Sequence, residues 1–136
     1  MNNQHQTILS VDLKKLEGNY TYLKSKLKED CRIIAVVKAH AYGHGDENIA
    51  RKLESLGVKH FWVADFEEGM RLRKSGIKST IMVANPSNKS FDAIIENRLD
   101  IVIHNKDLLE YYMSKKTSIN VHLKFNTGMN RYGFKA

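Results

Sequence analysis

Short apolar runs alternate with amphipathic segments along the chain. Five runs rich in β-branched or aromatic residues are predicted to be strands: 31–37, 60–65, 79–85, 100–105 and 118–126. Segments with apolar residues at helical spacing are predicted to be helices: 11–27, 46–57, 65–76, 88–99 and 106–116. The first helix is predicted to turn one apolar face inward, with Leu13, Leu16, Tyr20, Leu23 and Leu27 on it. Asp65 and Glu68 are predicted to form a capping box at the start of the third.

This alternation predicts an α/β fold with a parallel sheet covered on both faces. The βα unit repeats about every 20 to 25 residues, which suits either an open doubly wound sheet or part of a (β/α)8 TIM-type barrel. No G-x-G-x-x-G follows the first strand, so a dinucleotide-binding sheet has no support. A complete barrel needs roughly 200 residues or more, so a chain with about five βα units would be a partial barrel.

Composition places the chain among single-domain globular proteins. It has 136 residues, is 42% hydrophobic, and contains one proline and eight glycines, which leaves no room for a long flexible linker. No apolar run is long enough to span a bilayer, and the opening "MNNQHQTILS" lacks the features of a secretory signal. The only cysteine, Cys31, cannot form an internal disulfide, which favours a reducing, cytoplasmic location.

The net charge of +7 raises the question of a nucleic-acid partner. The lysines are spread over every polar segment, are mixed with acidic residues, and do not alternate with aromatic residues on one surface. Solvated helix faces explain them better than a binding patch. We therefore expect neither a nucleic-acid nor a membrane partner.

The stretch "IIAVVKAHAYGHG", residues 33–45, carries the strongest chemical signal. Lys38 ends an apolar strand, and ligands of parallel α/β proteins bind at the carboxyl ends of strands. Desolvation there favours the neutral amine, whose natural chemistry is Schiff-base formation with a carbonyl. The small residues after it let the backbone approach a ligand closely. The alternative is that Lys38 only extends from the strand end into water.

The wording of this stretch resembles the pyridoxal-phosphate motif of the alanine racemase family. The segment "AVVKAHAYGHG" differs from the usual motif at His40, where the family has asparagine. Three other segments are similar to family segments in order and spacing: "LSVDLKKLEGN", "WVADFEEGMRLRKSGI" and "VHLKFNTGMNRYGF". The last departs from the family signature at Asn126, where aspartate is usual.

The resemblance implies a (β/α)8 barrel followed by a β-rich domain, a homodimer, and pyridoxal 5′-phosphate as cofactor. Residues 1–136 would be the N-terminal portion of the barrel domain, without the later strands and the β-rich domain. Lys38 matches the lysine that binds the cofactor covalently and serves as a base on one face of the substrate Cα. A tyrosine of the partner subunit serves the other face, and this chain would lack it.

Further residues are implied by the same resemblance. Tyr42 matches a tyrosine that contacts the cofactor phosphate, and Val36 lies two residues before Lys38, so that it would face the cofactor ring from the same side of the strand. Ala84 matches a pocket-lining position at the end of the family's fourth strand. Arg131 matches a substrate-binding arginine, and Lys124 matches a lysine that is carbamylated in many members.

No metal site is expected. His40 and His44 lie four residues apart without a third ligand at metal spacing, and the motif implies a structural role for His44. Glu67 and Glu68 are interpreted as the acids that a helix N-terminus favours.

The implied function is interconversion of L- and D-alanine, which supplies D-alanine for peptidoglycan. We expect the 136-residue chain by itself to bind cofactor at most weakly and not to racemise alanine. Two alternatives stay open: a racemase for another amino acid such as serine or lysine, and a pyridoxal-phosphate-binding protein without turnover. Comparing the turnover of several L-amino acids by the full-length protein would distinguish the first alternative from an alanine racemase. Locating the lysine that the cofactor labels bears on the second alternative.

Overall fold

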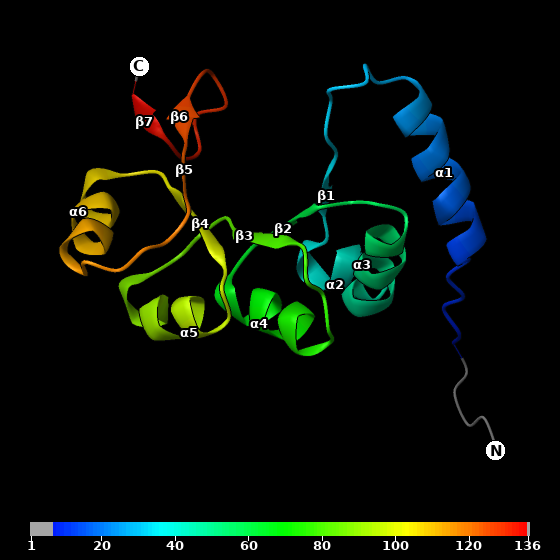
Figure 1. The fold of residues 1–136 in the computed structure, drawn as a ribbon, viewed down its shortest axis with the longest axis horizontal. Coiled ribbons are helices and arrows are strands. Elements are labelled where there is room, and N and C mark those ends of the chain that lie inside the picture. The colour runs from blue at the N-terminus through cyan, green and yellow to red at the C-terminus, as the bar shows by residue number, and fades with distance from the viewer. Residues whose placement is uncertain (1–6, 136) are drawn as a thin grey trace.

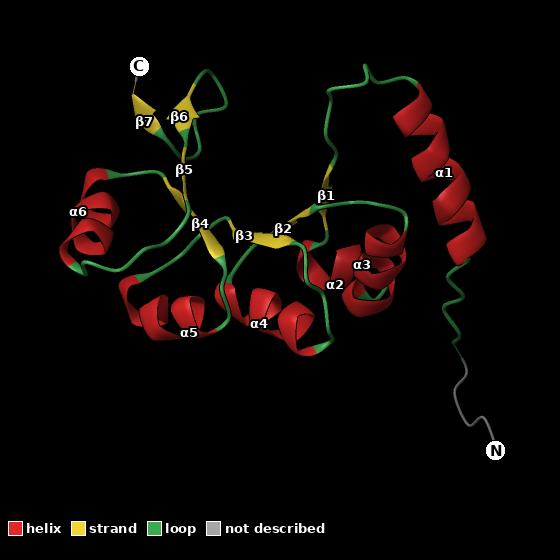
Figure 2. Ribbon diagram, in the orientation of Figure 1, coloured by secondary structure: helices red, strands yellow, loops and turns green. Residues whose placement is uncertain are grey.

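The computed structural model describes residues 7–135, which form a curved sheet of five parallel strands with helices along its outer side (Figure 1). Residues 1–6, in which the absence of a secretory signal was predicted, and Ala136 lie outside the described residues. Helices and strands alternate through the described chain, as the apolar pattern predicted (Figure 2).

The strands are β1 (Ile34–Val36), β2 (His60–Val63), β3 (Thr80–Val83), β4 (Asp100–Ile103), β5 (Val121–Leu123), β6 (Phe125–Asn126) and β7 (Phe134–Lys135). The helices are α1 (Leu13–Ser25), α2 (Lys38–Tyr42), α3 (Asp46–Ser55), α4 (Phe66–Lys74), the 3-10 helix η1 (Asn88–Ser90), α5 (Phe91–Glu96) and α6 (Lys106–Ser114). The sheet order is β1-β2-β3-β4-β5, and β6 and β7 form a separate parallel pair.

The strand order decides between the two predicted architectures. Spatial order follows chain order from β1 to β5, and α3, α4, α5 and α6 lie along the same side of the sheet (Figure 1). A doubly wound sheet would reverse its strand order and carry helices on both faces. Consecutive parallel strands inside a ring of helices are the arrangement of a (β/α)8 barrel. The fold is therefore the partial barrel predicted from the sequence.

The core lies between the sheet and its helices. Alternate strand residues point to this side, and those of the central strands are fully buried: Phe61, Val63, Ile81, Val83, Ile101 and Ile103. Each apolar side chain of this size contributes about 1.5–3 kcal/mol when buried. The two-residue repeat of the strands and the 3.6-residue repeat of the helices both place apolar side chains between the sheet and the helices. The residues that predicted the elements therefore also form the core.

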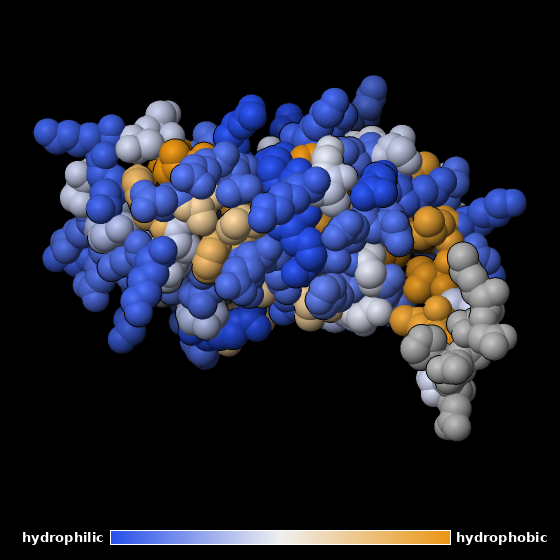
Figure 3. Space-filling model, turned by 90° about the horizontal axis from the view of Figure 1, so that it is seen from below, coloured by the Kyte–Doolittle hydropathy of each residue, from blue (hydrophilic) through white to orange (hydrophobic). Residues whose placement is uncertain are grey.

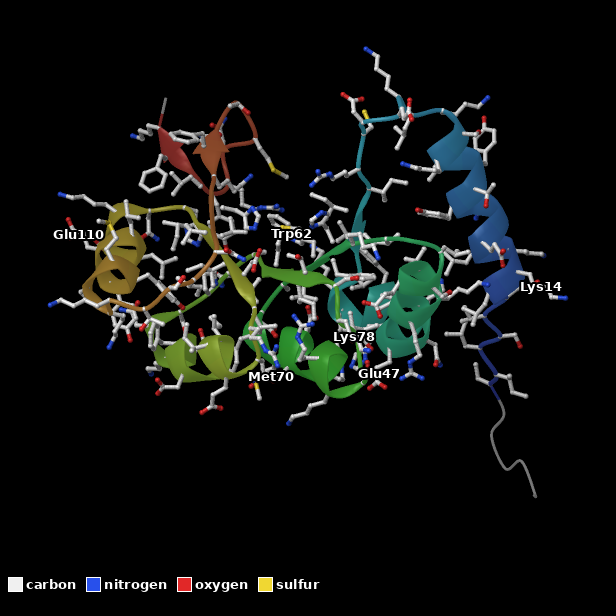
Figure 4. The ribbon with its side chains drawn as sticks, in the orientation of Figure 1. Lys14, Glu47, Trp62, Met70, Lys78 and Glu110 are labelled. Carbon is white, nitrogen blue, oxygen red and sulfur yellow. The ribbon has the colours of Figure 1, made fainter. Side chains whose placement is uncertain are left out.

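The prediction that both sheet faces are covered holds fully only for the helix side. Helices cover the outer face, and on the concave face Ile34 and Val36 of β1 are 49% and 45% exposed, whereas Met82 of β3 and Val102 of β4 are buried. Trp62 lies on this concave side, from which no helix approaches (Figure 4). The physical reason is that the inner face of a barrel is covered by strands opposite, not by helices.

Helix α1 packs less tightly than its sequence predicted. Leu13, Leu16 and Tyr20 contact the core, but Leu23 and Leu27 are 58% and 40% exposed, and no residue of the helix is buried. Only part of the predicted apolar face therefore packs against the core. Its sequence pattern identified a helix correctly but overestimated how much of it meets the sheet.

Two predicted elements are divided in the structure. The helix predicted over 88–99 begins as η1 and continues as α5, because Ser87 and Ser90 cap each other and tighten the first turn. The strand predicted over 118–126 is split into β5 and β6 at Lys124, where Phe134 of β7 donates its backbone N–H to the Lys124 carbonyl. The spacing of apolar residues alone could not predict either division.

The hydropathy of the surface differs from one region to another. Viewed from the helix side, the surface is largely hydrophilic, and its hydrophobic areas gather mainly beside the N-terminal segment (Figure 3). Among the residues described, none of the helices has the length and hydropathy that crossing a bilayer requires.

Candidate active site

The residues singled out in the sequence lie at one edge of the sheet. Lys38 is the second residue after the end of β1, Ala84 directly follows β3, and Lys124 directly follows β5. Because all five strands are parallel, their carboxyl ends meet at the same rim, where barrels bind ligands. Ala84 belongs to the third strand of this sheet and not to the fourth, as the resemblance had implied.

Lys38 lies just past the end of β1 and begins α2. Val36 is exposed on the concave face, Val37 is 2% exposed, and Lys38 is partly exposed. The Lys38 Nζ atom lies 6.0 Å from the centre of the Tyr42 ring, and the Tyr42 side chain is exposed. The structure thus brings Val36, Lys38 and Tyr42 together at the rim.

The backbone after Lys38 forms a left-handed turn that the sequence did not predict. Ala39, His40, Ala41 and Tyr42 have φ values of 51°, 53°, 51° and 56°. For residues with a Cβ atom this conformation costs about 1–2 kcal/mol each. The turn ends at Gly43, whose φ of 87° suits glycine. Such a strained run persists only where surrounding contacts hold it in place.

Glu68 provides one of these contacts. Its Oε1 atom accepts a 2.6 Å hydrogen bond from the Ala39 backbone N–H, and its Oε2 atom accepts a 2.7 Å bond from the Ala64 N–H. The predicted capping box is therefore only half formed: Asp65 caps the N–H of Glu68, but the Glu68 carboxylate bonds Ala64 and Ala39 and not Asp65. The interpretation of Glu68 as a helix-terminal acid missed this bridge.

A buried ion pair lies beside the turn. Asp46, 3% exposed, accepts hydrogen bonds from the Nε and Nη2 atoms of Arg71 at 3.0 and 2.7 Å, and His40 Nδ1 lies 3.5 Å from its other oxygen. The hydrogen bonds that Arg71 donates to Asp46, together with the charges of nearby carboxylates including Glu68, raise the pKa of Arg71. These contacts join α2, α3 and α4. His44 also holds the turn, with its Nδ1 2.9 Å from the Ala41 carbonyl oxygen.

Arg131 and Lys124 reach the rim from the other end of the sheet. Lys124 is partly buried between β5 and β6, whereas Arg131 is exposed, its guanidinium 5.9 Å from the centre of the Tyr132 ring. Within residues 7–135 no hydrogen bond or ion pair joins these two side chains to each other or to Lys38. The structure brings the predicted site residues to one rim but does not place the two groups in contact.

Asn126 organises the loop that carries Arg131. Its Oδ1 atom accepts the backbone N–H groups of Gly128 at 3.2 Å and Asn130 at 2.9 Å, and its Nδ2 donates to Asn130 Oδ1 at 2.8 Å. An aspartate could accept the same two N–H groups but could not donate. The departure at Asn126 therefore removes a charge and keeps the loop geometry.

His104 follows β4 at the same rim and carried no signal in the sequence. Its ring lies 4.8 Å from the Tyr132 ring, and its Nε2 is buried with no hydrogen-bond partner in the described part of the chain. Burial lowers the pKa of His104; a hydrogen bond to the backbone opposes this shift, and the charge of Lys124 adds to it. The fold thus favours the neutral imidazole beside the loop that carries Arg131.

The lowered pKa predicts a pH-dependent contribution of His104 to stability. Between the ordinary value of 6.5 and the lower folded value, the unfolded chain binds more protons, so stability falls as the pH drops through this window. The variant His104→Phe keeps the ring stack, loses the titrating group and removes the unpartnered nitrogen. In urea unfolding at about pH 7.5 and about pH 5, it is expected to lose less stability on acidification than the wild type. Equal losses in both proteins would contradict this assignment.

No metal-binding cluster is visible at the rim: across residues 7–135 there is no group of three or more His, Cys, Asp or Glu side chains that could hold a metal ion. The chemistry available there is that of an amine, a phenol, a guanidinium and an imidazole.

Comparisons with known proteins identify the family of the chain. Residues 11–136 match the family model described as alanine racemase, N-terminal domain. The alanine racemase of Fusobacterium nucleatum is 36% identical over 133 residues, covering 96% of this chain and 37% of that protein. The alanine racemase of Geobacillus kaustophilus is 38% identical, with 95% and 35% covered. The chain thus spans little more than a third of the length of these relatives.

Solved structures show the same fold. The alanine racemase of Clostridium difficile 630 superposes with a TM-score of 0.86 at 30% identity, covering 95% of this chain and 37% of that one. The structure from E. faecalis gives a TM-score of 0.86 at 29% identity, with 91% and 35% covered. The strand order, the rim position of Lys38 and these matches agree, and the chain belongs to the alanine racemase family, whose N-terminal domain it matches over residues 11–136.

Proposed function

We propose that this chain forms the lysine-bearing part of a pyridoxal-phosphate-dependent amino-acid racemase that acts on alanine. The observation that supports this best is the place of Lys38, which follows the first barrel strand, is partly exposed, lies near the Tyr42 ring and is followed directly by a left-handed turn. A lysine that only extended into water would need no strained turn behind it.

The rim residues fit the cofactor. The Lys38 amine is accessible to an aldehyde, the Tyr42 hydroxyl is exposed beside it and can donate to a phosphate, and Val36 offers an exposed apolar surface for a ring. Ala84, partly exposed after β3, leaves room at the pocket wall. When bound, pyridoxal phosphate would withdraw electrons from the substrate Cα and so stabilise the charge left by loss of its proton.

The chain's own residues would then bind the substrate and move its proton. The Lys38 Nζ would take the Cα proton from one face and return it to the same face. The exposed Arg131 guanidinium can bind the substrate carboxylate through two parallel hydrogen bonds. Lys124, if carbamylated, becomes an anion that orients this guanidinium. The contact between the His104 and Tyr132 rings would keep the Arg131 loop near the rim.

Inversion needs a second base on the opposite face of the Cα. The chain covers 37% of the length of the Fusobacterium relative, and we assign the second base, the rest of the barrel and the β-rich domain to the remainder of such a protein. Assembly as a homodimer, in which the partner subunit contributes that base, and a cytoplasmic location belong to the same proposal.

Reductive trapping tests the proposal directly. The chain is mixed with pyridoxal phosphate, reduced with borohydride and digested, and the adduct is located by mass spectrometry. We expect one dominant adduct, on Lys38, and none at that position after Lys38→Ala. Lys14→Ala is the matched control, because Lys14 lies on the outer side of α1 away from the sheet (Figure 4). Adducts scattered evenly over many lysines would contradict a built cofactor site.

Substrate identity is tested separately. Turnover of L-alanine, L-serine and L-lysine is compared in a chain that includes the rest of the barrel and the β-rich domain. Preference for alanine is expected, and faster turnover of serine or lysine would move the assignment to a racemase for that amino acid.

A further inference from the structure

The left-handed turn at residues 39–42 raises the question of what holds it. Residues with a Cβ atom rarely adopt this conformation, and four in succession require contacts from outside the turn. Internal hydrogen bonds are present, such as Ala41 N–H to the Val37 carbonyl at 2.9 Å, but a left-handed turn of any four residues would make them. The constraint must come from neighbouring elements.

Glu68 is the side chain that reaches the start of the turn. Ala39, which directly follows Lys38, donates its backbone N–H to one carboxylate oxygen, and Ala64, which directly follows β2, donates to the other. The two bonds, at 2.6 and 2.7 Å, are as short as charge-assisted hydrogen bonds become. One carboxylate therefore joins the ends of two neighbouring barrel strands at the rim.

We propose that Glu68 is a positioning residue that sets the turn after Lys38 and thereby directs the Lys38 amine to the concave face. Glu68 bonds to no reacting group and acts only through the Ala39 backbone. The consequence for cofactor binding rests on the proposed function; the consequence for the backbone does not.

The two donors that bond to the Glu68 side chain require a carboxylate at this position. Both partners are N–H groups, so each oxygen of the side chain must accept. Glutamine in its place has one accepting oxygen and an amide that donates, which would face an N–H group and leave it unpaired. The position at the first turn of the nine-residue helix α4 also favours the negative charge, and Arg71 on the same helix adds a positive charge nearby.

The first experiment measures the backbone without cofactor. Amide hydrogen exchange is followed by NMR in the wild type and in Glu68→Gln. Exchange at Ala39 and Ala64 is expected to become at least about tenfold faster in Glu68→Gln, while amides of the buried central strands keep their protection. The control Glu67→Gln changes the exposed neighbouring acid, whose side chain makes no hydrogen bond or ion pair within residues 7–135, and is expected to leave both rates unchanged.

The second experiment measures the consequence for Lys38. In the borohydride assay, Glu68→Gln is expected to reduce the share of adduct on Lys38 by about fivefold or more, with a corresponding rise at other lysines. Glu54→Ala is the matched control for general destabilisation. Glu54 also accepts two backbone N–H groups, those of Lys78 and Ser79, but at the opposite end of the sheet, so its loss should leave labelling at Lys38 selective.

A rescue variant separates positioning from stability. Glycine adopts positive φ without the Cβ penalty. Ala39→Gly therefore removes part of the backbone strain of the turn, which in the wild type is offset by the hydrogen bond to Glu68. In the Glu68→Gln background, Ala39→Gly is expected to restore at least half of the Lys38-selective labelling. If Glu68→Gln does not fold, Glu68→Asp replaces it, because its shorter side chain cannot reach both N–H groups.

The outcomes distinguish the two proposals. Wild-type labelling without preference for Lys38 would overturn the cofactor assignment, while the exchange rates at Ala39 and Ala64 would still test Glu68. Unchanged exchange at Ala39 and unchanged labelling in a folded Glu68→Gln variant would overturn the positioning role and leave the cofactor assignment intact.

Discussion

Replacing Arg73 with alanine is expected to lower the free energy of unfolding by about 1.5–3 kcal/mol, because a partly buried fork of charge-assisted hydrogen bonds is lost. The guanidinium donates to the carbonyl oxygens of Asn97 at 3.0 Å, Ile77 at 2.6 Å, Ser79 at 3.2 Å and Arg98 at 3.0 Å. These carbonyls lie where α4 ends and where α5 leads into β4. One side chain thus satisfies backbone groups from two consecutive βα units.

Urea unfolding of Arg73→Ala measures this effect. Arg73→Lys should fall between the wild type and alanine, because one ammonium group cannot reach four carbonyls arranged for a planar fork. Arg51→Ala is the control. Arg51 is exposed, and within residues 7–135 its side chain makes a 3.3 Å bond to the Ser75 carbonyl and a 3.8 Å ion pair with Glu47, which predicts a loss of about 0.5 kcal/mol. A change below about 1 kcal/mol for Arg73→Ala would show that water replaces the fork.

The strands and most helices could be predicted because burial and period agree. Ile81 and Val83 in β3, and Ile101 and Ile103 in β4, are apolar at alternate positions and are fully buried against the helices. The pattern does not report what covers the other face, so exposure of Ile34 was not foreseen. Coverage on that side depends on strands opposite in a barrel, which is a property of the tertiary fold.

The position of the site was predictable, but its geometry was not. Lys38 could be placed at a strand end from its apolar neighbours, and parallel strands then required the other ends to lie at the same rim. A left-handed turn over four consecutive residues that carry a Cβ atom, Ala39 to Tyr42, contradicts their local propensities, so only tertiary contacts could reveal it. Glu68 and Arg73 were missed for a related reason: their partners are backbone groups, which no residue pattern marks.

Lys38→Ala is expected to reduce cofactor-dependent exchange of the alanine Cα proton by about 10²–10⁴-fold, the usual contribution of a positioned base. The assay follows deuterium incorporation into L- and D-alanine by NMR in D₂O, with pyridoxal phosphate added. Because Lys38 serves one face, the wild-type chain should exchange one enantiomer faster than the other and retain its configuration. Lys14→Ala should match the wild type, since Lys14 is exposed on α1 away from the rim.

The stereochemistry makes this the sharpest test of Lys38. Lys38→Ala should exchange both enantiomers equally, at the rate of free pyridoxal phosphate, and added methylamine should restore part of the rate by replacing the missing amine. Exchange by Lys38→Ala within about threefold of the wild type would assign the base to another group. Racemisation by the 136-residue chain at the rate of a full-length relative would contradict the assignment of the second base outside it, because proton delivery to both faces would then arise within these residues.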